Sequence, residues 1–261
     1  MLFLLSPAKS LDYAAPTPPE IASRATEPAF LDRSAELIAL LRKKSPAAIA
    51  GLMGISPALA ALNVERFAHW SPTFTPANSK PAALAFDGDV YGGLDAPSLP
   101  AADLDWAQRH IAILSGLYGV LRPLDRLQPY RLEMGTALAN RHGRDLYAYW
   151  GDAIAEHLNV RAAADGTPVI VNLASQEYFK AADRRRVLRP RVIDCVFEEW
   201  HGGRYKVISF FAKRARGLMA RHAVQQRIAT PEGLTRFEAE GYRFAADASL
   251  PGRLVFRRRP D

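Results

Sequence analysis

The sequence predicts a single compact domain of mixed α and β structure (α+β) over residues 1–261, with helices around a mixed or antiparallel sheet. Three observations indicate this fold class. Helical and strand patterns alternate irregularly, residues 192–200 and 205–211 flank Gly202-Gly203 as the arms of an antiparallel hairpin, and no linker is long enough to separate two domains. A hydrophobic fraction of 49% with 23% charged residues is ordinary globular composition, which excludes a disordered chain.

The N-terminal quarter is predicted to be one buried strand followed by helices. The apolar residues 1–5 lead into a loop, because three prolines in residues 14–20 remove hydrogen-bond donors and favour extended backbone. Leucine and isoleucine then recur at helical spacing, and two serine–proline pairs each supply an N-cap hydroxyl and a proline at the first helical position. The predicted helices cover residues 30–43, 46–52 and 57–69.

The rest of the chain alternates between the two patterns. Residues 82–86 are apolar and end at Asp87-Gly88-Asp89, which predicts a strand entering a turn. The two aspartates are either ordinary turn residues or ligands for a hard cation. Residues 169–173 are continuously apolar, which is typical of a strand buried on both faces. Spacing predicts further helices over 103–115 and 212–228, and a last strand over 254–257.

Positive charge is concentrated in the last third of the chain. The formal net charge is +7, with 19 Lys and Arg against 9 Asp and Glu in residues 180–261 and 15 against 18 in residues 1–179. A basic third favours a polyanionic partner, whether nucleic acid, a nucleotide or an anionic surface. The alternative is an arginine-rich chain with solvated charged faces, since arginine outnumbers lysine 27 to 7.

Cysteine and histidine usage argues against disulfide, metal and cofactor chemistry. Cys195 is the single cysteine, so we expect an inert core thiol and no thiolate metal site. The six histidines show neither metal-ligand spacing nor a catalytic triad pattern, so no metal site and no cofactor are predicted. No apolar run approaches the ~20 residues of a membrane span, and residues 1–5 lack signal-peptide features. We therefore expect a cytoplasmic protein with no membrane partner.

The polar loop at residues 6–10 is a candidate phosphate site. Lys9 and two serine hydroxyls follow directly on the first predicted strand, and the carboxyl end of a strand is the usual ligand position in sheet proteins. The loop lacks the glycines of a P-loop. The alternative is a capped surface loop with a solvated lysine.

Two glycines mark a candidate DNA-binding hairpin. Gly116 and Gly119 follow a predicted helix, an arrangement that resembles the helix-hairpin-helix element, whose loop amides contact DNA phosphates without reading bases. Arg122, Arg126 and Arg131 come shortly afterwards. The Gly-x-x-Gly spacing departs from the Gly-x-Gly of that element, and a plain helix C-cap at the first glycine is the alternative.

One predicted helix is strongly basic. Lys213, Arg214, Arg216 and Arg221 lie in a run that contains no acid over residues 210–225. Neighbouring cations repel one another when no acid relieves them, which favours a helix that faces phosphate.

Two further segments supply candidates for a pocket. Arg131 and Glu133 lie in a turn-like segment, either as substrate groups or as a structural ion pair. Asn172 and Glu177 follow the most buried predicted strand, with Lys180 one helical turn further on. At this strand-to-helix junction the polar groups are candidates for the floor of a site. The alternative is that Glu177 and Lys180 form an ordinary surface pair.

Long motifs lie at residues 4–13, 85–91, 115–125, 128–135, 172–180 and 212–219. Taken together, they resemble the YaaA family of bacterial peroxide-stress-resistance proteins. The resemblance implies a cytoplasmic single-domain protein that limits free iron and DNA damage during hydrogen peroxide stress. It also implies a family-specific mixed α/β fold with a positive cleft and a helix-hairpin-helix-like element at about residues 111–126 that binds duplex and branched DNA. Ser10 and Asp87 depart from the family's usual threonine and lysine.

Two functions follow as hypotheses, and whether the protein is an enzyme stays open. The first is sequence-independent binding of DNA phosphates through Lys9, Gly116, Gly119, Arg122, Arg126, Lys180, Lys213, Arg214, Arg216 and Arg221. The second is an enzyme or binder for an anionic, nucleotide-like small molecule, with a pocket formed by Lys9, Arg122, Arg131, Glu133, Asn172, Glu177 and Lys213. The sequence assigns no catalytic role to any of these residues.

Overall fold

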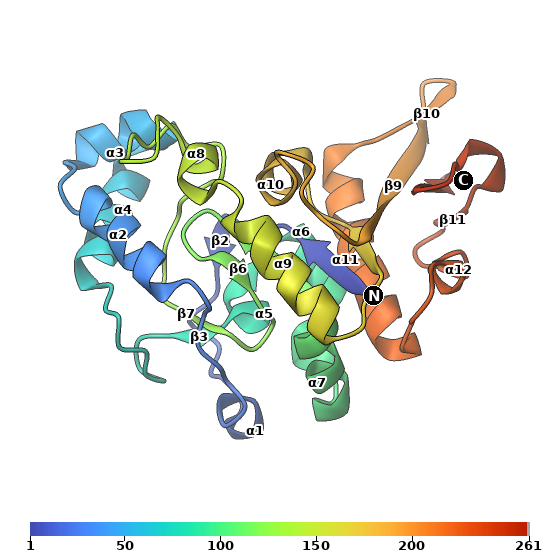
Figure 1. Cartoon of the computed structure of the whole chain (residues 1–261), viewed down its shortest axis with the longest axis horizontal. Helices are drawn as coiled ribbons and strands as arrows, with labels where there is room; N and C mark the ends of the chain where they lie inside the picture. Colours follow the sequence, from blue (N-terminus) through green and yellow to red (C-terminus); the bar gives the residue numbers. More distant parts are fainter. Residues whose placement is uncertain (260–261) are drawn as a thin grey trace.

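The computed structural model describes residues 1–259, and it confirms the mixed α/β class. Its centre is an eight-stranded sheet in which five adjacent strands run parallel, while β6 and β11 pair antiparallel at the two ends and β10 pairs antiparallel with β9 (Figure 1). In spatial order the strands are β11 (Arg243–Phe244), β12 (Arg253–Arg258), β9 (Arg191–His201), β8 (Val169–Asn172), β1 (Leu2–Leu5), β5 (Ile111–Ser115) and β6 (Gly119–Leu121), with β10 (Arg204–Lys206) beside β9.

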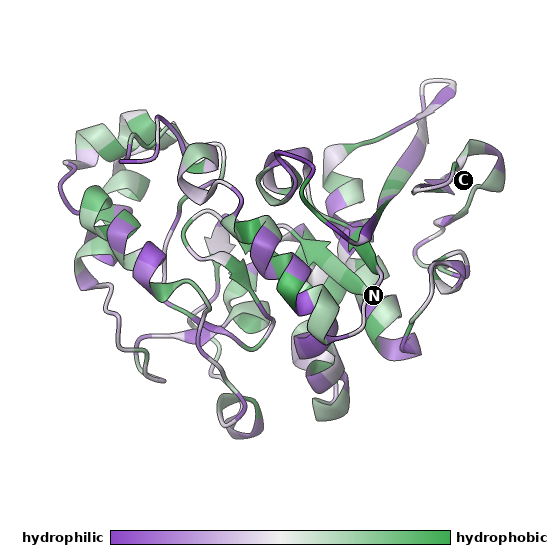
Figure 2. Ribbon diagram, in the orientation of Figure 1, coloured by the Kyte–Doolittle hydropathy of each residue, from purple (hydrophilic) through white to green (hydrophobic). Residues whose placement is uncertain are grey.

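The central strands are apolar on both faces because helices cover both faces of the sheet. All four residues of β1 are buried, and Phe3 pairs with Ile111 on one side and Val171 on the other. Figure 2 shows this part of the ribbon as hydrophobic. The continuous apolar run predicted as a doubly buried strand is therefore confirmed at β8, next to β1.

Two groups of long helices flank the sheet. In Figure 1, α9 (Ala153–Ala164) crosses in front of the sheet, and α10 (Gln176–Ala182) packs beside it. On the other side, α7 (Ala101–His110) and α11 (Ser209–Gln226) pack against β1 and against each other, and α11 crosses α6 (Asp89–Leu94). These helices bring the segments after β1 and β8 close to α6 and α11.

The three predicted N-terminal helices are confirmed. They are α2 (Leu31–Leu41), α3 (Pro46–Met53) and α4 (Pro57–His69), and they form the end of the molecule next to β6 (Figure 1). Ser45 Oγ accepts a hydrogen bond from the Ala48 amide at 3.2 Å, as expected of an N-cap. No single helix in residues 1–259 is long and apolar enough to span a membrane; α3 and α4 pass that test only as a pair bent by 110°.

Short elements complete the described chain. The small strands β2 (Ser10–Leu11) and β4 (Phe86–Asp87) pair with each other, as do β3 (Lys80–Pro81) and β7 (Arg126–Leu127). The short helices are α1 (Pro19–Ala22), α5 (Ala82–Ala85), α8 (Leu146–Trp150), α12 (Pro231–Leu234) and the 3₁₀ turns Ala96–Ser98 and Ala246–Ala248.

Two glycines allow α6 and α11 to cross at backbone contact. A Cβ atom at Gly217 would lie 1.8 Å from the Val90 carbonyl oxygen, and one at Gly93 would lie 2.4 Å from the Arg214 carbonyl oxygen. No larger residue fits at either position without moving a helix. The crossing brings Asp89, at the start of α6, to the same side of the molecule as Lys213.

Three predicted elements are wrong in type or extent. The helix predicted over 103–115 ends at His110, and the next five residues form strand β5. The strand predicted over 82–86 is mostly helix α5, and the strand arm predicted over 205–211 ends at Lys206 before α11 begins at Ser209. Short apolar runs fit a buried helix or a buried strand equally well, so their spacing alone did not decide between them.

The helix-hairpin-helix-like element predicted at residues 111–126 is a β-hairpin of β5 and β6. Gly116 and Gly119 are buried in it, and only Gly119 has a positive φ, of 66°. The Trp150 indole covers the turn: its Nε1 donates to the Gly116 carbonyl at 3.0 Å, and its ring lies 2.7 Å from where a Cβ of Gly119 would be. Because both glycines are buried, this turn does not present their amides at the surface where a DNA phosphate could be bound.

Candidate functional site

The main candidate site lies where the chain leaves two adjacent parallel strands in opposite directions. From β1 the chain eventually reaches β5 on one side, whereas from β8 it passes through α10 to β9 on the other side. The crevice beyond such a switch point is the usual ligand position in open α/β sheets. A pocket of about 380 Å³ opens there, next to the loop after β1 and the start of α10.

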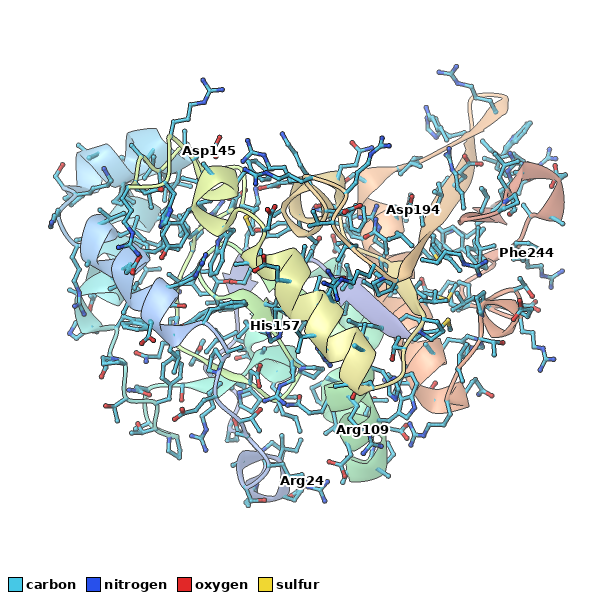
Figure 3. All side chains as sticks on the ribbon, viewed as in Figure 1. Arg24, Arg109, Asp145, His157, Asp194 and Phe244 are labelled. Carbon is cyan, nitrogen blue, oxygen red and sulfur yellow. The ribbon has the colours of Figure 1, made fainter. Side chains whose placement is uncertain are left out.

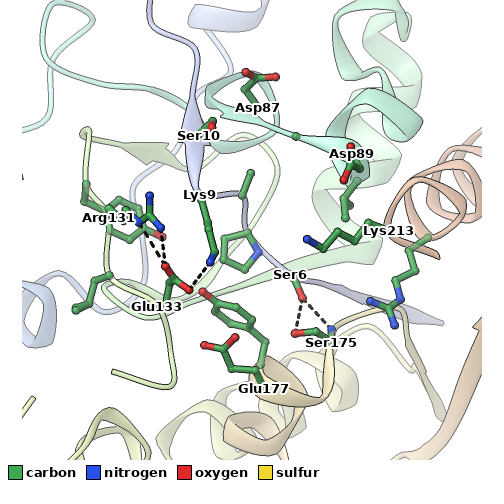
Figure 4. Close-up of a pocket in the computed structure, with 18 residues that line it drawn as sticks. Ser6, Lys9, Ser10, Asp87, Asp89, Arg131, Glu133, Ser175, Glu177 and Lys213 are labelled. Carbon is green, nitrogen blue, oxygen red and sulfur yellow. Dashed lines mark hydrogen bonds and ion pairs between the residues drawn. The ribbon is translucent and has the colours of Figure 1, made fainter. Parts of the chain in front are cut away.

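Five segments that are distant in sequence line this pocket (Figure 4). The loop after β1 contributes Ser6 and Lys9, and α11 contributes Lys213 and Arg216. The remaining walls come from the β4–α6 junction with Asp87 and Asp89, the segment 130–133, and the start of α10 with Ser175, Glu177 and Tyr178. The volume lies at the lower end of the range typical of small-molecule sites, roughly 300–1,000 Å³.

One wall of the pocket is an ion-pair cluster centred on Glu133. Lys9 Nζ lies 2.9 Å from Glu133 Oε2, and Arg131 Nη2 donates to Glu133 Oε1 at 3.1 Å. The Lys9 side chain is 63% exposed and that of Arg131 only 17%. The lysine is therefore the accessible member of the cluster, and Arg131 holds the carboxylate in place.

The opposite wall carries two cations without an acidic partner. Lys213 points into the pocket from α11 (Figure 4), and Arg216 follows one turn later on the same helix. Among the described residues neither has a carboxylate within 4.0 Å. Arg216 Nε is buried and has no hydrogen-bond partner there, and burial lowers the pKa of Arg216. An anion in the pocket would satisfy both groups.

Three carboxylates of the pocket lack a cationic partner within residues 1–259: Asp87, Asp89 and Glu177. Glu177 is half-buried, and its Oε1 accepts a hydrogen bond from the Gly135 amide at 2.8 Å. That bond fixes the side chain and leaves Oε2 for another donor. No group of three or more His, Cys, Asp or Glu able to hold a metal ion occurs among the residues described.

Hydroxyl groups complete the lining. The Ser175 amide donates to Ser6 Oγ at 2.8 Å, and the two serine hydroxyls lie 3.3 Å apart (Figure 4). The lining also includes Tyr130 and Tyr178, which are buried, and burial raises the pKa of both phenols, so they stay neutral. Sequence reasoning missed these two tyrosines as pocket residues, and their aromatic character alone gave no signal to separate them from core residues.

Five of the seven residues predicted to share a pocket do so: Lys9, Arg131, Glu133, Glu177 and Lys213. Asn172 and Arg122 lie outside its lining. Asn172 Nδ2 donates to Asp194 Oδ1 at 2.8 Å, which ties the end of β8 to β9, where Figure 3 labels Asp194. Arg122 Nη2 pairs with Asp125 Oδ1 at 3.0 Å beside a separate cavity that His157 and Arg161 also line.

Most of the other predicted phosphate-binding residues make contacts within the protein. Arg214 pairs with Glu240 at 2.6 Å, and Arg221 Nη1 donates to the Leu94 and Asp95 carbonyls, both at 2.9 Å. Arg221 Nη1 also lies 3.5 Å from Asp95 Oδ2. The expectation that no acid relieves this helix is therefore wrong for Arg214 and Arg221, because Glu240 and Asp95 come from other segments. Arg126 Nη2 donates to the Ala22 carbonyl at 3.3 Å, and Lys180 Nζ lies 4.6 Å above the Tyr147 ring.

The fold and the site together define an α/β protein with a polar pocket at the carboxyl edge of its parallel strands. The chain belongs to a family whose model is described as peroxide stress protein YaaA, which matches residues 1–248. It is similar to UPF0246 proteins of Paracidovorax citrulli and Variovorax paradoxus, both 64% identical over 99% of each chain, and of Ralstonia nicotianae, 63% identical over 99% of each. This membership supports a role in the peroxide stress response.

Proposed function

We propose that the pocket binds a small compound carrying a phosphate or carboxylate group. One observation supports this above all: Lys213 and Arg216 face the pocket without an acidic partner among the described residues, and a buried Nε of Arg216 lacks an acceptor. A cationic nitrogen that is partly removed from water needs an anion to offset the lost hydration. DNA backbone is a poorer fit, since the pocket is concave and also carries four carboxylates.

The part of the pocket that carries Glu133 and Glu177 suits proton transfer to or from such a compound. Glu177 has one oxygen fixed by the Gly135 amide and the other free, and Lys9 reaches into the pocket beside Glu133. A carboxylate held in place next to a bound substrate can act as a general base, and a lysine in the same pocket can stabilise developing negative charge. The arrangement is that of an acid–base enzyme for an anionic substrate, which extends the second of the two sequence-based hypotheses.

The test is the response of thermal stability to orthophosphate and to a mononucleotide. We expect each to raise the Tm of the native protein through binding to the folded state, and Lys213→Ala to weaken that binding about tenfold, the loss of one charge-assisted contact. Lys43→Ala is the matched control, because Lys43 is exposed at the end of α2, outside the pocket lining. Equal responses of the two variants would contradict the proposal.

DNA binding is a second proposed function, and a different surface favours it. The segment 184–191 contains five arginines that are exposed, and within the described chain only Arg185 has an ion pair, with Asp152 at 3.0 Å. Cations of this kind bind DNA phosphates without reading sequence. None of them lines the pocket.

Salt dependence tests the DNA proposal. We expect a triple variant, Arg184→Ala with Arg186→Ala and Arg189→Ala, to weaken binding similarly on unrelated duplexes and to reduce the slope of log K against log salt by roughly 2–3. The replacement of Arg122 and Arg126, which the structure places beside the buried hairpin, should leave the slope unchanged. A triple variant with an unaltered slope would exclude this segment.

Limitation of free iron and a cytoplasmic location are carried over from the family as proposals for this chain. We expect no tightly bound iron, so that any effect on iron is indirect. Iron measured in the purified protein after mild chelation is the test, and a stoichiometric amount would contradict it.

A further inference from the structure

The pocket contains as many negative as positive side chains. Its lining includes four cations, Lys9, Arg131, Lys213 and Arg216, and four carboxylates, Asp87, Asp89, Glu133 and Glu177. A ligand with negative charge alone would leave the filled pocket with a net negative charge. A ligand that carries one charge of each sign keeps it near neutrality, which is the less costly state in a partly desolvated site.

The charges are also separated within the pocket. Glu133 already accepts from both Lys9 and Arg131, so the carboxylate of this cluster is fully paired. The unpaired cations both come from α11, whereas the unpaired Glu177 comes from α10, and Figure 4 shows Glu177 and Lys213 on different sides of the pocket. A ligand that contacts both must therefore present an anion at one end and a hydrogen-bond donor at the other.

From this arrangement we infer that the ligand is an amine-bearing acid: a small compound with a phosphate or carboxylate at Lys213 and Arg216 and a protonated amine at Glu177. The inference rests on the proposed function, since it names the ligand class of the same pocket. Glu177 Oε2 is the acceptor, because Oε1 is occupied by the Gly135 amide. At the β4–α6 junction Asp87 is exposed and Asp89 is half-buried, and both add favourable potential for a cation.

Matched probe pairs test the inference by calorimetric titration. The first pair is O-phosphoethanolamine and ethyl phosphate, and the second is 4-aminobutanoate and butanoate; within each pair only the amine differs. Only the amine-bearing member of each pair can form a charge-assisted hydrogen bond to Glu177. We therefore expect at least one amine-bearing probe to bind about tenfold or more tightly than its partner. Glu177→Gln should bring that ratio close to one, since glutamine can still accept from the Gly135 amide but carries no charge.

The outcomes separate this inference from the proposed function. Glu156→Gln is the control, an exposed carboxylate on α9 outside the pocket lining, and it should keep the native ratio. Equal affinities within both pairs, or a ratio unchanged by Glu177→Gln, would overturn the amine-bearing ligand and leave an anion site intact. Failure of all four probes to bind the native protein would overturn the anion site as well.

Discussion

Cys195 is the residue whose chemistry matters most for a peroxide stress protein, and its environment makes it unreactive. It is buried on β9, and burial raises the pKa of its thiol, with the nearby Asp194 carboxylate acting in the same direction. The thiolate is the form that reacts with peroxide, so this thiol is almost entirely in the inert form at neutral pH.

We therefore predict that Cys195 is not a peroxide sensor. In the native protein the thiol should not react with Ellman's reagent over minutes and should resist dilute hydrogen peroxide, whereas in denaturant it should react stoichiometrically. Mass spectrometry after peroxide treatment provides the independent measurement. Rapid sulfenic acid formation in the folded protein would contradict the prediction.

His222 should make stability depend on pH. Its Nε2 is buried without a hydrogen-bond partner, its ring packs edge-on against Phe237 at 5.6 Å, and burial lowers its pKa from the usual 6.5. A lowered pKa means that the unfolded chain binds the proton more tightly, so the contribution to stability is complete above about pH 6.5 and is lost as pH falls toward the folded-state pKa.

Urea unfolding at several pH values measures this effect. Between pH 7 and 5.5 the free energy of unfolding should fall more steeply in the native protein than in His222→Leu, which cannot titrate. His157 on α9 (Figure 3) also has a pKa lowered by burial, so some slope should persist in the variant. Identical slopes would exclude a contribution from His222.

At the scale of the element, the crossing of α6 and α11 is the most demanding contact near the site. A methyl group at Gly217 would meet the Val90 carbonyl at 1.8 Å, so Gly217→Ala must push the two helices apart. We expect a loss of stability of about 1–3 kcal/mol, the usual cost of overpacking, together with weaker phosphate binding because Lys213 lies one turn away.

Gly51→Ala is the matched control for this prediction. Gly51 lies inside α3, and a Cβ there would have no neighbour within 4 Å, so the substitution should stabilise the protein by roughly 0.5–1 kcal/mol through helix propensity. Chemical denaturation of both variants measures the difference. If Gly217→Ala behaved like Gly51→Ala, the close crossing would not exist in solution.

The sequence predicted elements well where local signals decide and poorly where tertiary contacts decide. Helices α3 and α4 are each predicted by a serine at the N-cap and a proline at the first helical position. Residues 111–115 carry no such signal, and they form a strand because β1 and β6 flank them in the sheet. The hairpin glycines were placed at the right turn, but nothing local showed that Trp150, 31 residues beyond Gly119, would bury them.

At the scale of the whole molecule, much of the basic last third is neutralised by acids that are distant in sequence. Arg227 pairs with Asp103 and Arg258 with Glu199, at 2.6 and 3.0 Å. The local sequence shows such cations but not their partners, so it could not show that Arg214 and Arg221 on α11 are paired within the protein. Lys213 differs from these residues, because it lines the pocket and its charge stays unpaired among the described residues.

The cations proposed to bind DNA and those proposed to bind the small anion lie on different segments, so the two proposed functions can be tested against each other. The arginines of residues 184–191 follow α10, whereas Lys213 lies on α11 and faces the pocket. Substitutions at distant sites with no shared partner have additive effects on free energy. Lys213→Ala should therefore weaken phosphate binding and leave duplex DNA affinity within about twofold, with the reverse for the triple arginine variant. The combined variant should show the sum of both losses in each assay. If either change impaired both ligands equally, DNA and the small anion would compete for a single surface, and saturating phosphate would then displace DNA at constant ionic strength.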